Sequence, residues 1–188
     1  MASYIDAAAI VSSGTALVLY QHSIGLTESN IGVLSAALTL SIAVGALTGG
    51  RLGDRFGRRT VFITTMAMIV IGSVLLVLAS GISMLMPGMV LVGLGAGADL
   101  PVSLASISEA ASDHNRGKLV GLSQIQWFAG IVGANVFGII VGDMGQLGGQ
   151  IMFAHIGLVS LLVLLLRLSI PESATWATAR SEQLAGSV

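Results

Sequence analysis

The sequence predicts an all-α transmembrane protein, a six-helix bundle with both termini on the cytoplasmic side. Three observations lead to this prediction. Hydrophobic residues make up 54% of the 188 residues and charged residues only 9%, whereas soluble domains carry roughly 25% charged residues. The chain contains six long apolar runs, each of about the length that a helix needs to cross a hydrocarbon core of about 30 Å. The basic residues all fall in alternate connections between these runs or at and beyond the end of the last one.

The six predicted spans follow one another with short polar connections. Each run is continuously apolar, and a single segment in lipid must satisfy its own backbone hydrogen bonds, so helices are expected rather than strands. We expect residues 1–170 to form one bundle and residues 171–188 to form a cytoplasmic tail or the start of a central linker. A polar loop is expected at 21–30 and a short turn near Gly81 and Pro87. The predicted spans are 3–20, 31–50, 61–80, 85–109, 119–141 and 151–168.

The first span has no Lys or Arg before it, which argues for a span that stays in the protein rather than a cleaved signal peptide.

The most highly charged stretch is residues 50–59, between the second and third spans. It holds four arginines and Asp54, and we expect it to be a tight loop at the membrane face. The other basic residues lie in the fourth-to-fifth connection or at and beyond the end of the sixth span. By the positive-inside rule this side is cytoplasmic, which predicts a multi-pass protein of the plasma membrane, or of the inner membrane in a bacterium. The eight basic residues are Arg51, Arg55, Arg58, Arg59, Arg116, Lys118, Arg167 and Arg180.

Small residues recur every four positions within three spans, and such rows let neighbouring helices approach closely. We therefore interpret Gly93-x-Gly95-x-Gly97 as a packing face and not as a dinucleotide loop, which needs a preceding strand in a soluble βαβ unit. The rows are Gly45, Gly49 and Gly53; Gly93 and Gly97; and Gly130, Ala134 and Gly138.

A few polar residues lie inside the spans and are functional candidates by default. Asp6 lies in the first span and Asp99 well inside the fourth. No Lys or Arg lies in the interior of a span, so neither carboxyl group is expected to have a strong cationic partner. Each should then favour its protonated form, which makes Asp6 and Asp99 candidates for proton coupling. The alternatives are an interfacial position for Asp6 and a hydrogen-bonded structural role for Asp99.

Three further side chains are candidates for binding a substrate. Gln124 and Asn135 are eleven residues apart, which places them about 20° apart around one helix. Ser103 shares a helix face with Asp99. For His155, in the sixth span, we favour a packing role. The chain has no cysteine, and it shows no nucleophilic triad, metal-ligand cluster or phosphate loop. We predict no enzymatic activity, no cofactor and no nucleic-acid partner; the expected partners are the lipid bilayer, a small-molecule substrate and protons.

Several of these stretches together resemble a known family. The stretch from Gly50 to Arg59 resembles the signature loop between helices two and three of the major facilitator superfamily. Three more stretches resemble its sugar-porter and metabolite/proton symporter branch and occur in the family's order. They are Gly93-x-Gly95-x-Gly97 followed by Pro101, Arg116-Gly117-Lys118-Leu119, and Pro171-Glu172-Ser173.

The resemblance implies a fold, a function and roles for several residues. The fold would be the N-terminal half of a twelve-helix protein, which needs a C-terminal half or a second copy to complete its site. The function would be secondary transport of a sugar, polyol, organic acid or phosphate. The helix-one aspartate, here Asp6, is a proton site in several members, and the helix-five glutamine, here Gln124, contacts substrate in sugar porters. A cytoplasmic gating network is implied at Asp54, Arg55, Arg58, Glu109 and Arg116.

The sequence also departs from the family pattern. Met89 stands where sugar/proton symporters often have an arginine, which favours a two-carboxylate arrangement over an Asp–Arg switch. Ala174-Thr175-Trp176 replaces the usual Pro-Arg-Trp. The alternative function is a non-transporting membrane subunit, or an inactive fragment that keeps the fold.

Overall fold

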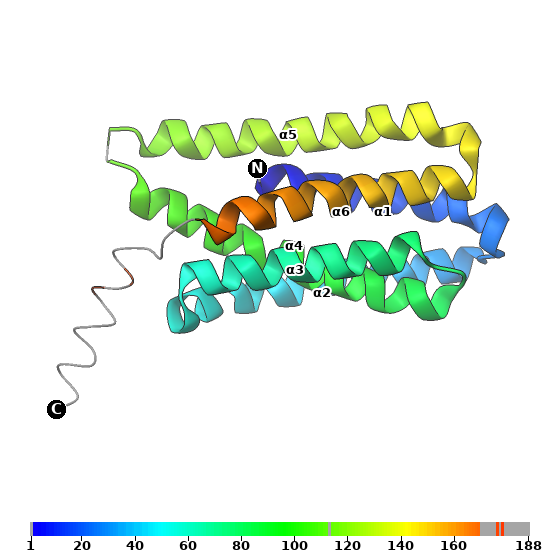
Figure 1. Ribbon diagram of the computed structural model, residues 1–188, viewed down its shortest axis with the longest axis horizontal. Helices are drawn as coiled ribbons and strands as arrows, with labels where there is room; N and C mark the ends of the chain where they lie inside the picture. The colour runs from blue at the N-terminus through cyan, green and yellow to red at the C-terminus, as the bar shows by residue number, and fades with distance from the viewer. Residues whose placement is uncertain (1, 113, 170–175, 177, 179–188) are drawn as a thin grey trace.

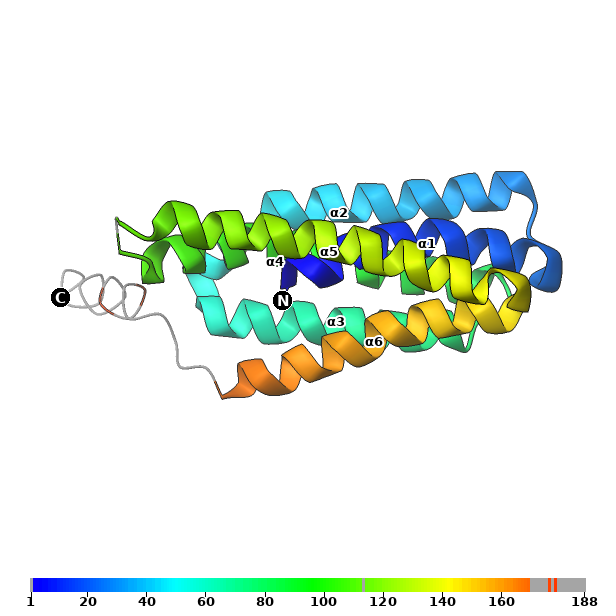
Figure 2. The same ribbon diagram turned by 90° about the horizontal axis from the view of Figure 1, so that it is seen from above.

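The computed structural model describes residues 2–112, 114–169, 176 and 178. These residues form six long helices that run along one axis (Figures 1 and 2). All six are long and apolar enough to cross a membrane, which confirms the predicted number of spans. The division at residue 170 stays a prediction, and most of the proposed tail lies outside the described residues. The helices are α1 (Ala2–Ile24), α2 (Glu28–Phe56), α3 (Arg58–Val77), α4 (Ile82–Ala110), α5 (Arg116–Val141) and α6 (Gln146–Leu168), with a short 3-10 helix, η1 (Gly142–Met144), before α6.

The charged stretch at 50–59 is not the loop that we expected. Helix α2 continues through the first arginines to Phe56, and α3 begins at Arg58, so only Gly57 separates them. The backbone φ of Gly57 is +95°, a conformation that glycine adopts at little cost, and its N–H donates to the Gly53 carbonyl over 3.1 Å. A single glycine therefore makes the turn, and the arginines extend from helix ends.

At two other connections, the helices are longer than we predicted. Helix α1 reaches Ile24 and α2 begins at Glu28, so the expected loop at 21–30 is mostly helical. Helix α4 begins at Ile82, three residues before the predicted start at 85, so Pro87 lies inside it and not in a turn. Proline is tolerated inside membrane-spanning helices because neighbouring helices and local adjustments can satisfy the backbone groups that it leaves free.

The rows of small residues lie at close helix contacts, as predicted. A Cβ built on Gly49 would lie 2.5 Å from the Ala98 carbonyl oxygen, and one built on Gly97 would collide with the Ile42 carbonyl. On the other side of the bundle, a Cβ on Gly130 would collide with the Tyr4 carbonyl. These glycines thus let α2 pack on α4, and α5 on α1, at backbone distance.

The helices differ in how far the bundle covers them. Figure 1 shows α5 along one edge, with α1 and α6 between it and the group of α2, α3 and α4. Helices α1 and α4 are the most buried spans, and α5 and α2 are the least buried. Two hydrogen bonds join α1 and α6 to the end of α3: Tyr20 donates to the Leu76 carbonyl over 2.9 Å, and Gln150 to the Val77 carbonyl over 3.0 Å.

One end of the bundle collects the described basic residues. The end of α2, the start of α3, the end of α4, the start of α5 and the end of α6 meet there: Arg58 pairs with Glu109, and Arg59 donates to the Leu168 carbonyl over 2.8 Å. That this end faces the cytoplasm stays a prediction from the positive-inside rule.

Candidate functional site

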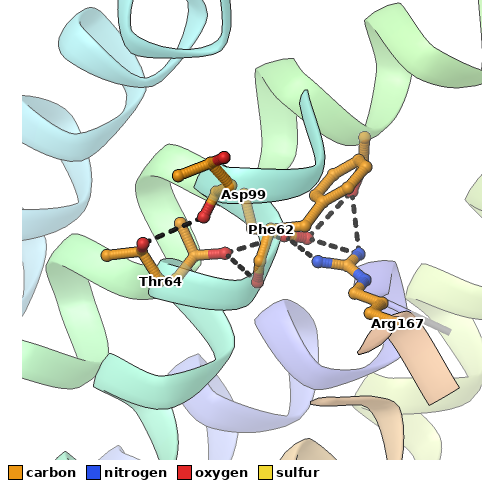
Figure 3. A network of polar contacts seen from close by, with 7 residues as sticks. Phe62, Thr64, Asp99 and Arg167 are labelled. Atoms are coloured by element: carbon orange, nitrogen blue, oxygen red, sulfur yellow. Dashed lines mark hydrogen bonds and ion pairs between the residues drawn. The ribbon is translucent and has the colours of Figure 1, made fainter. Parts of the chain in front are cut away.

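Asp99 has a cationic partner, contrary to the prediction from the sequence. The Arg167 guanidinium donates from Nη1 to Oδ1 of Asp99 over 2.5 Å and from Nη2 to Oδ2 over 3.3 Å. Asp99 is fully buried and Arg167 is 9% exposed. Figure 3 shows the Arg167 side chain pointing toward Asp99. The pair is a buried, two-point ion pair between α4 and α6.

Three further residues surround this ion pair. The Ser103 hydroxyl donates to Oδ2 of Asp99 over 2.9 Å and lies 3.3 Å from Nη2 of Arg167. The Thr65 hydroxyl lies 3.1 Å from Oδ1 of Asp99, and also 3.1 Å from the Phe62 carbonyl, so its one proton serves either acceptor. The guanidinium carbon lies 4.0 Å from the centre of the Phe62 ring, a cation–π contact. Every charged atom of the pair therefore lies beside polar or aromatic groups.

Sequence reasoning missed Arg167 because it is the second-last residue of α6 and was counted with the cytoplasmic loops. Side chains on a helix point back toward its N-terminus, and for α6 that direction leads into the bundle. The long arginine stem can therefore place its head group inside the span while its backbone stays near the end. An arginine in the last turn of a span, with an aspartate inside another span, was the signal available in the sequence.

Asp6 is in different surroundings. Its side chain is 2% exposed, and neither carboxylate oxygen has a hydrogen-bond partner among the described residues. It borders a cavity of about 50 Å³ between α1, α2, α4 and α5, together with Ile42, Gly97 and Trp127. Of the two predicted carboxylates, only Asp99 has an ion-pair partner among the described residues.

Part of the predicted gating network is assembled. Nη2 of Arg58 lies 2.9 Å from Oδ1 of Asp54 and 2.9 Å from Oε1 of Glu109. The Arg55 guanidinium instead lies 5.3 Å from the centre of the Phe56 ring, and Arg116 is exposed at the first residue of α5. These contacts join the ends of α2, α3 and α4. That they act as a gate stays a prediction.

The same end of the bundle also holds a residue from beyond α6. The Trp176 indole N–H donates to the Asp54 carbonyl over 2.7 Å. That carbonyl lies in the last turn of α2, where backbone acceptors have no partner within the helix. The Pro171-Glu172-Ser173 stretch lies outside the described residues.

The three predicted substrate-binding residues do not form one cluster. Gln124 and Asn135 are both exposed on α5, and the Asn135 amide donates to the Ile131 carbonyl over 2.8 Å. Ser103 is buried, with its hydroxyl in the Asp99 network. His155 is packed, as expected: Nε2 lies 3.2 Å from the Tyr4 hydroxyl, and the ring stacks on Phe137 with centroids 4.4 Å apart.

Six long membrane-spanning helices, with polar groups buried among them and a charged network at one end, define one half of a major facilitator fold. The crystal structure of a D-xylose-proton symporter has the same arrangement: its TM-score is 0.75 at 22% identity, over 99% of this chain and 52% of that chain. A partially occluded inward-open structure of the xylose transporter from E. coli gives 0.78 at 21% identity, over 97% and 51%.

The chain belongs to the family described as "Sugar (and other) transporter", whose profile matches residues 4–186. It is 38% identical to the minor myo-inositol transporter IolF of Bacillus subtilis (strain 168), over 95% of this chain and 41% of that protein. It is 32% identical to the niacin transporter NiaP of Acinetobacter baylyi, over 79% and 33%. It is 33% identical to the 3-(3-hydroxy-phenyl)propionate transporter of Escherichia coli (strain K12), over 92% and 41%.

The chain thus spans about four-tenths of the length of the first of these relatives. It is a multi-pass protein of the plasma membrane, and these relatives are transporters, not enzymes.

Proposed function

We propose that the chain forms the N-terminal half of a secondary transporter for a small polar metabolite, coupled to protons through Asp6 and Asp99. The substrate would be a sugar, polyol, organic acid or phosphate. The relatives include transporters of a polyol, myo-inositol, and of two organic acids, niacin and 3-(3-hydroxy-phenyl)propionate. A polyol or an organic acid is therefore the favoured substrate class.

The observation that carries this proposal is the exposure of Gln124 and Asn135 on the least buried membrane span. A carboxamide that faces hydrocarbon without a full set of hydrogen bonds costs several kcal/mol by order of magnitude. Such groups are tolerated where they line a water-filled cavity or face another protein segment. In transporters built from two repeats, the substrate lies between the repeats. The exposed face of α5 would then be one wall of the substrate path.

We propose that a second half, or a second copy of the chain, is needed to complete the site. Helices α2 and α5 both carry large exposed apolar side chains, among them Leu47, which is 74% exposed, and Ile139, which is 82% exposed. Alternating access requires one half to rock against another around a central site. One bundle has only one wall of that site, so we expect no transport by the chain alone.

A chimera tests the proposal. Residues 1–170 would be joined to the C-terminal half of the Bacillus subtilis myo-inositol transporter, and uptake of labelled myo-inositol into proteoliposomes would be measured. We expect an inward proton gradient to accelerate uptake and a protonophore to abolish that acceleration. The chain alone, in the same vesicles, is the control and should show no uptake.

Each part of the proposal can fail separately. Uptake that ignores the proton gradient would refute proton coupling. Uptake by the chain alone would refute the need for a second half. A correctly inserted chimera without uptake would favour the alternative, a non-transporting membrane subunit.

A further inference from the structure

Asp6 is a buried carboxyl group without the partners that Asp99 has. Both of its oxygens are covered, and neither has a hydrogen-bond partner among the described residues. Buried polar side chains almost always have a partner, so an orphaned one marks a place where another molecule can bind. The cavity of about 50 Å³ beside Asp6, called the Asp6 cavity below, is where a small group can enter.

The Asp6 cavity lies where four helices meet, close to the surface of the bundle. Ile42 and Ala46 of α2, Leu100 of α4 and Trp127 of α5 line it together with Asp6 of α1. Ala46 is exposed, and Ile42, Leu100 and Trp127 are half-buried. The cavity is therefore shallow, with the carboxyl group as its most deeply buried polar group among the described residues.

Trp127 connects the Asp6 cavity to the proposed substrate path. It follows Gln124 by three residues on α5, and residues with this spacing are neighbours on the surface of a helix. Gln124 is exposed, whereas Trp127 is half-buried. The indole ring thus lies on the α5 face that carries the exposed amide, and it also borders the cavity beside Asp6.

We propose that the Asp6 cavity is a subsite for one hydroxyl group of an uncharged polyol, which Asp6 binds by a hydrogen bond while Trp127 packs against the adjacent carbon atoms. This inference rests on the proposed function, because it names the substrate class of the same path. It selects the polyol over the organic acid.

A hydroxyl group suits the Asp6 cavity in size and in hydrogen bonding. One water molecule occupies about 30 Å³ in the liquid, so the cavity has room for a group of that size. A hydroxyl donates to a carboxylate oxygen and accepts from a protonated carboxyl group, so it pairs with Asp6 in either state. The carbon atoms next to the hydroxyl then lie against the large apolar surface of the indole ring.

A carboxylate suits the Asp6 cavity poorly. The side chains of Ile42, Ala46 and Leu100 are apolar, and burying a charge in such surroundings costs far more than burying a hydroxyl. A carboxylate also has no proton to donate to Asp6. The buried guanidinium of Arg167 contacts both oxygens of Asp99, so its charge is already compensated.

Equilibrium dialysis of the chain in lipid nanodiscs tests the substrate class. Labelled myo-inositol is the uncharged polyol probe, and labelled nicotinate is the carboxylate probe. We expect saturable binding of myo-inositol, with nicotinate bound at least tenfold more weakly. Equal binding of the two probes, or no binding of myo-inositol, would overturn the proposal.

Substitutions of Asp6 test the contact with the hydroxyl group. Asp6→Leu removes both oxygens and should weaken the binding of myo-inositol about tenfold, as expected for the loss of one hydrogen bond. Asp6→Asn keeps one oxygen that accepts from a hydroxyl and should weaken binding less. Unchanged binding in Asp6→Leu would refute the subsite and leave water as the occupant of the cavity.

Trp127 gives a readout at the cavity itself. The chain has two tryptophans, so Trp176→Phe leaves Trp127 as the only one. Because the Asp6 oxygens are covered, we expect the indole to shift when a hydroxyl group enters, and its emission should follow the dialysis curve for myo-inositol. An emission that does not respond to bound myo-inositol would place the polyol elsewhere. This measurement needs no change at Asp6, so it decides the proposal even if Asp6→Leu does not fold.

A matched pair on α5 tests the packing role of Trp127. Trp127→Ala should weaken the binding of myo-inositol about tenfold. Leu122→Ala is the control, because Leu122 is 51% exposed and lies about 140° from Trp127 around the helix; it should bind as the unmodified chain does. Equal binding in the two variants would remove Trp127 from the subsite.

The subsite and the transport function fail separately. Binding of myo-inositol that depends on Asp6, without uptake by the chimera, would refute transport alone. Proton-driven uptake by the chimera, with equal binding of both probes to the chain, would refute the subsite alone.

Discussion

Arg58 and Glu109 join the first residue of α3 to the last turn of α4 through a 2.9 Å ion pair. The same guanidinium nitrogen lies 2.9 Å from Asp54 in the last turn of α2. One arginine thus connects three helix ends where the chain turns on a single glycine. A Cβ on Gly53 would lie 2.8 Å from the Arg58 guanidinium, so the small residue there makes room for the arginine head.

Replacing this arginine should loosen that end of the bundle. We expect Arg58→Gln to lower the free energy of unfolding by about 1–2 kcal/mol, because an exposed ion pair contributes up to about 1 kcal/mol and Arg58 makes two while only 12% exposed. Glu109→Gln should cost less, since the contact with Asp54 remains. Unfolding in mixed detergent micelles measures both. Arg55→Gln is the control, because the Arg55 guanidinium lies 5.3 Å from the centre of the neighbouring Phe56 ring; an equal loss there would contradict the prediction.

Two adjacent glycines of α2 should respond oppositely to alanine. A Cβ on Gly49 would lie 2.5 Å from the Ala98 carbonyl oxygen and 2.7 Å from its Cα, whereas a Cβ on Gly50 has nothing within 4 Å. Gly49→Ala should destabilise by roughly 1–3 kcal/mol through overpacking. Gly50→Ala should be neutral or stabilise by up to about 1 kcal/mol, because alanine favours the helix. Thermal unfolding of both variants in one detergent would settle the comparison, and equal stabilities would rule out close α2–α4 packing as the reason for Gly49.

Two serines of α4 provide a second matched pair. The Ser103 hydroxyl donates to Asp99, whereas the buried Ser106 hydroxyl has no partner among the described residues. Ser103→Ala should cost about 1.5–3 kcal/mol, the range for a hydrogen bond to a charged group. Ser106→Ala should be close to neutral or slightly stabilising. A larger loss in Ser106→Ala than in Ser103→Ala, in the same unfolding assay, would show that the Asp99 network is not the more important contact.

The exposed glutamine of α5 should affect substrate rather than stability. In the chimera, Gln124→Ala should raise the KM for substrate about tenfold, which corresponds to losing one hydrogen bond of roughly 1.4 kcal/mol. The melting temperature should not change, because Gln124 is exposed and not part of the bundle core. Ile125→Ala, on the next and also exposed residue, is the control for a general effect of truncating α5. An unchanged KM in Gln124→Ala would remove Gln124 from the substrate path.

The sequence was sufficient for the fold class, because membrane helices depend on local properties. A hydrophobic run has to span the bilayer and satisfy its own backbone, so length and composition alone predicted six helices. The four-residue spacing of Gly45, Gly49, Gly93 and Gly97 likewise marked the close contact of α2 with α4. The ends were less predictable. A helix can continue past the membrane boundary. Helix α2 does so, because it includes the charged residues that precede Phe56.

The tertiary structure decided which polar groups are partners. The sequence by itself showed two aspartates in spans, the amides of α5 and a charged stretch with its partner Glu109. It could not show that Arg167, at the end of α6, reaches Asp99 on α4, while Asp6 on α1 has no hydrogen-bond partner among the described residues. A side chain's partners depend on helix rotation and on the direction of long side chains, and both are set by packing between helices that lie far apart in the chain. The difference between a paired and an unpaired carboxylate, which separates the two aspartates chemically, exists only in the folded bundle.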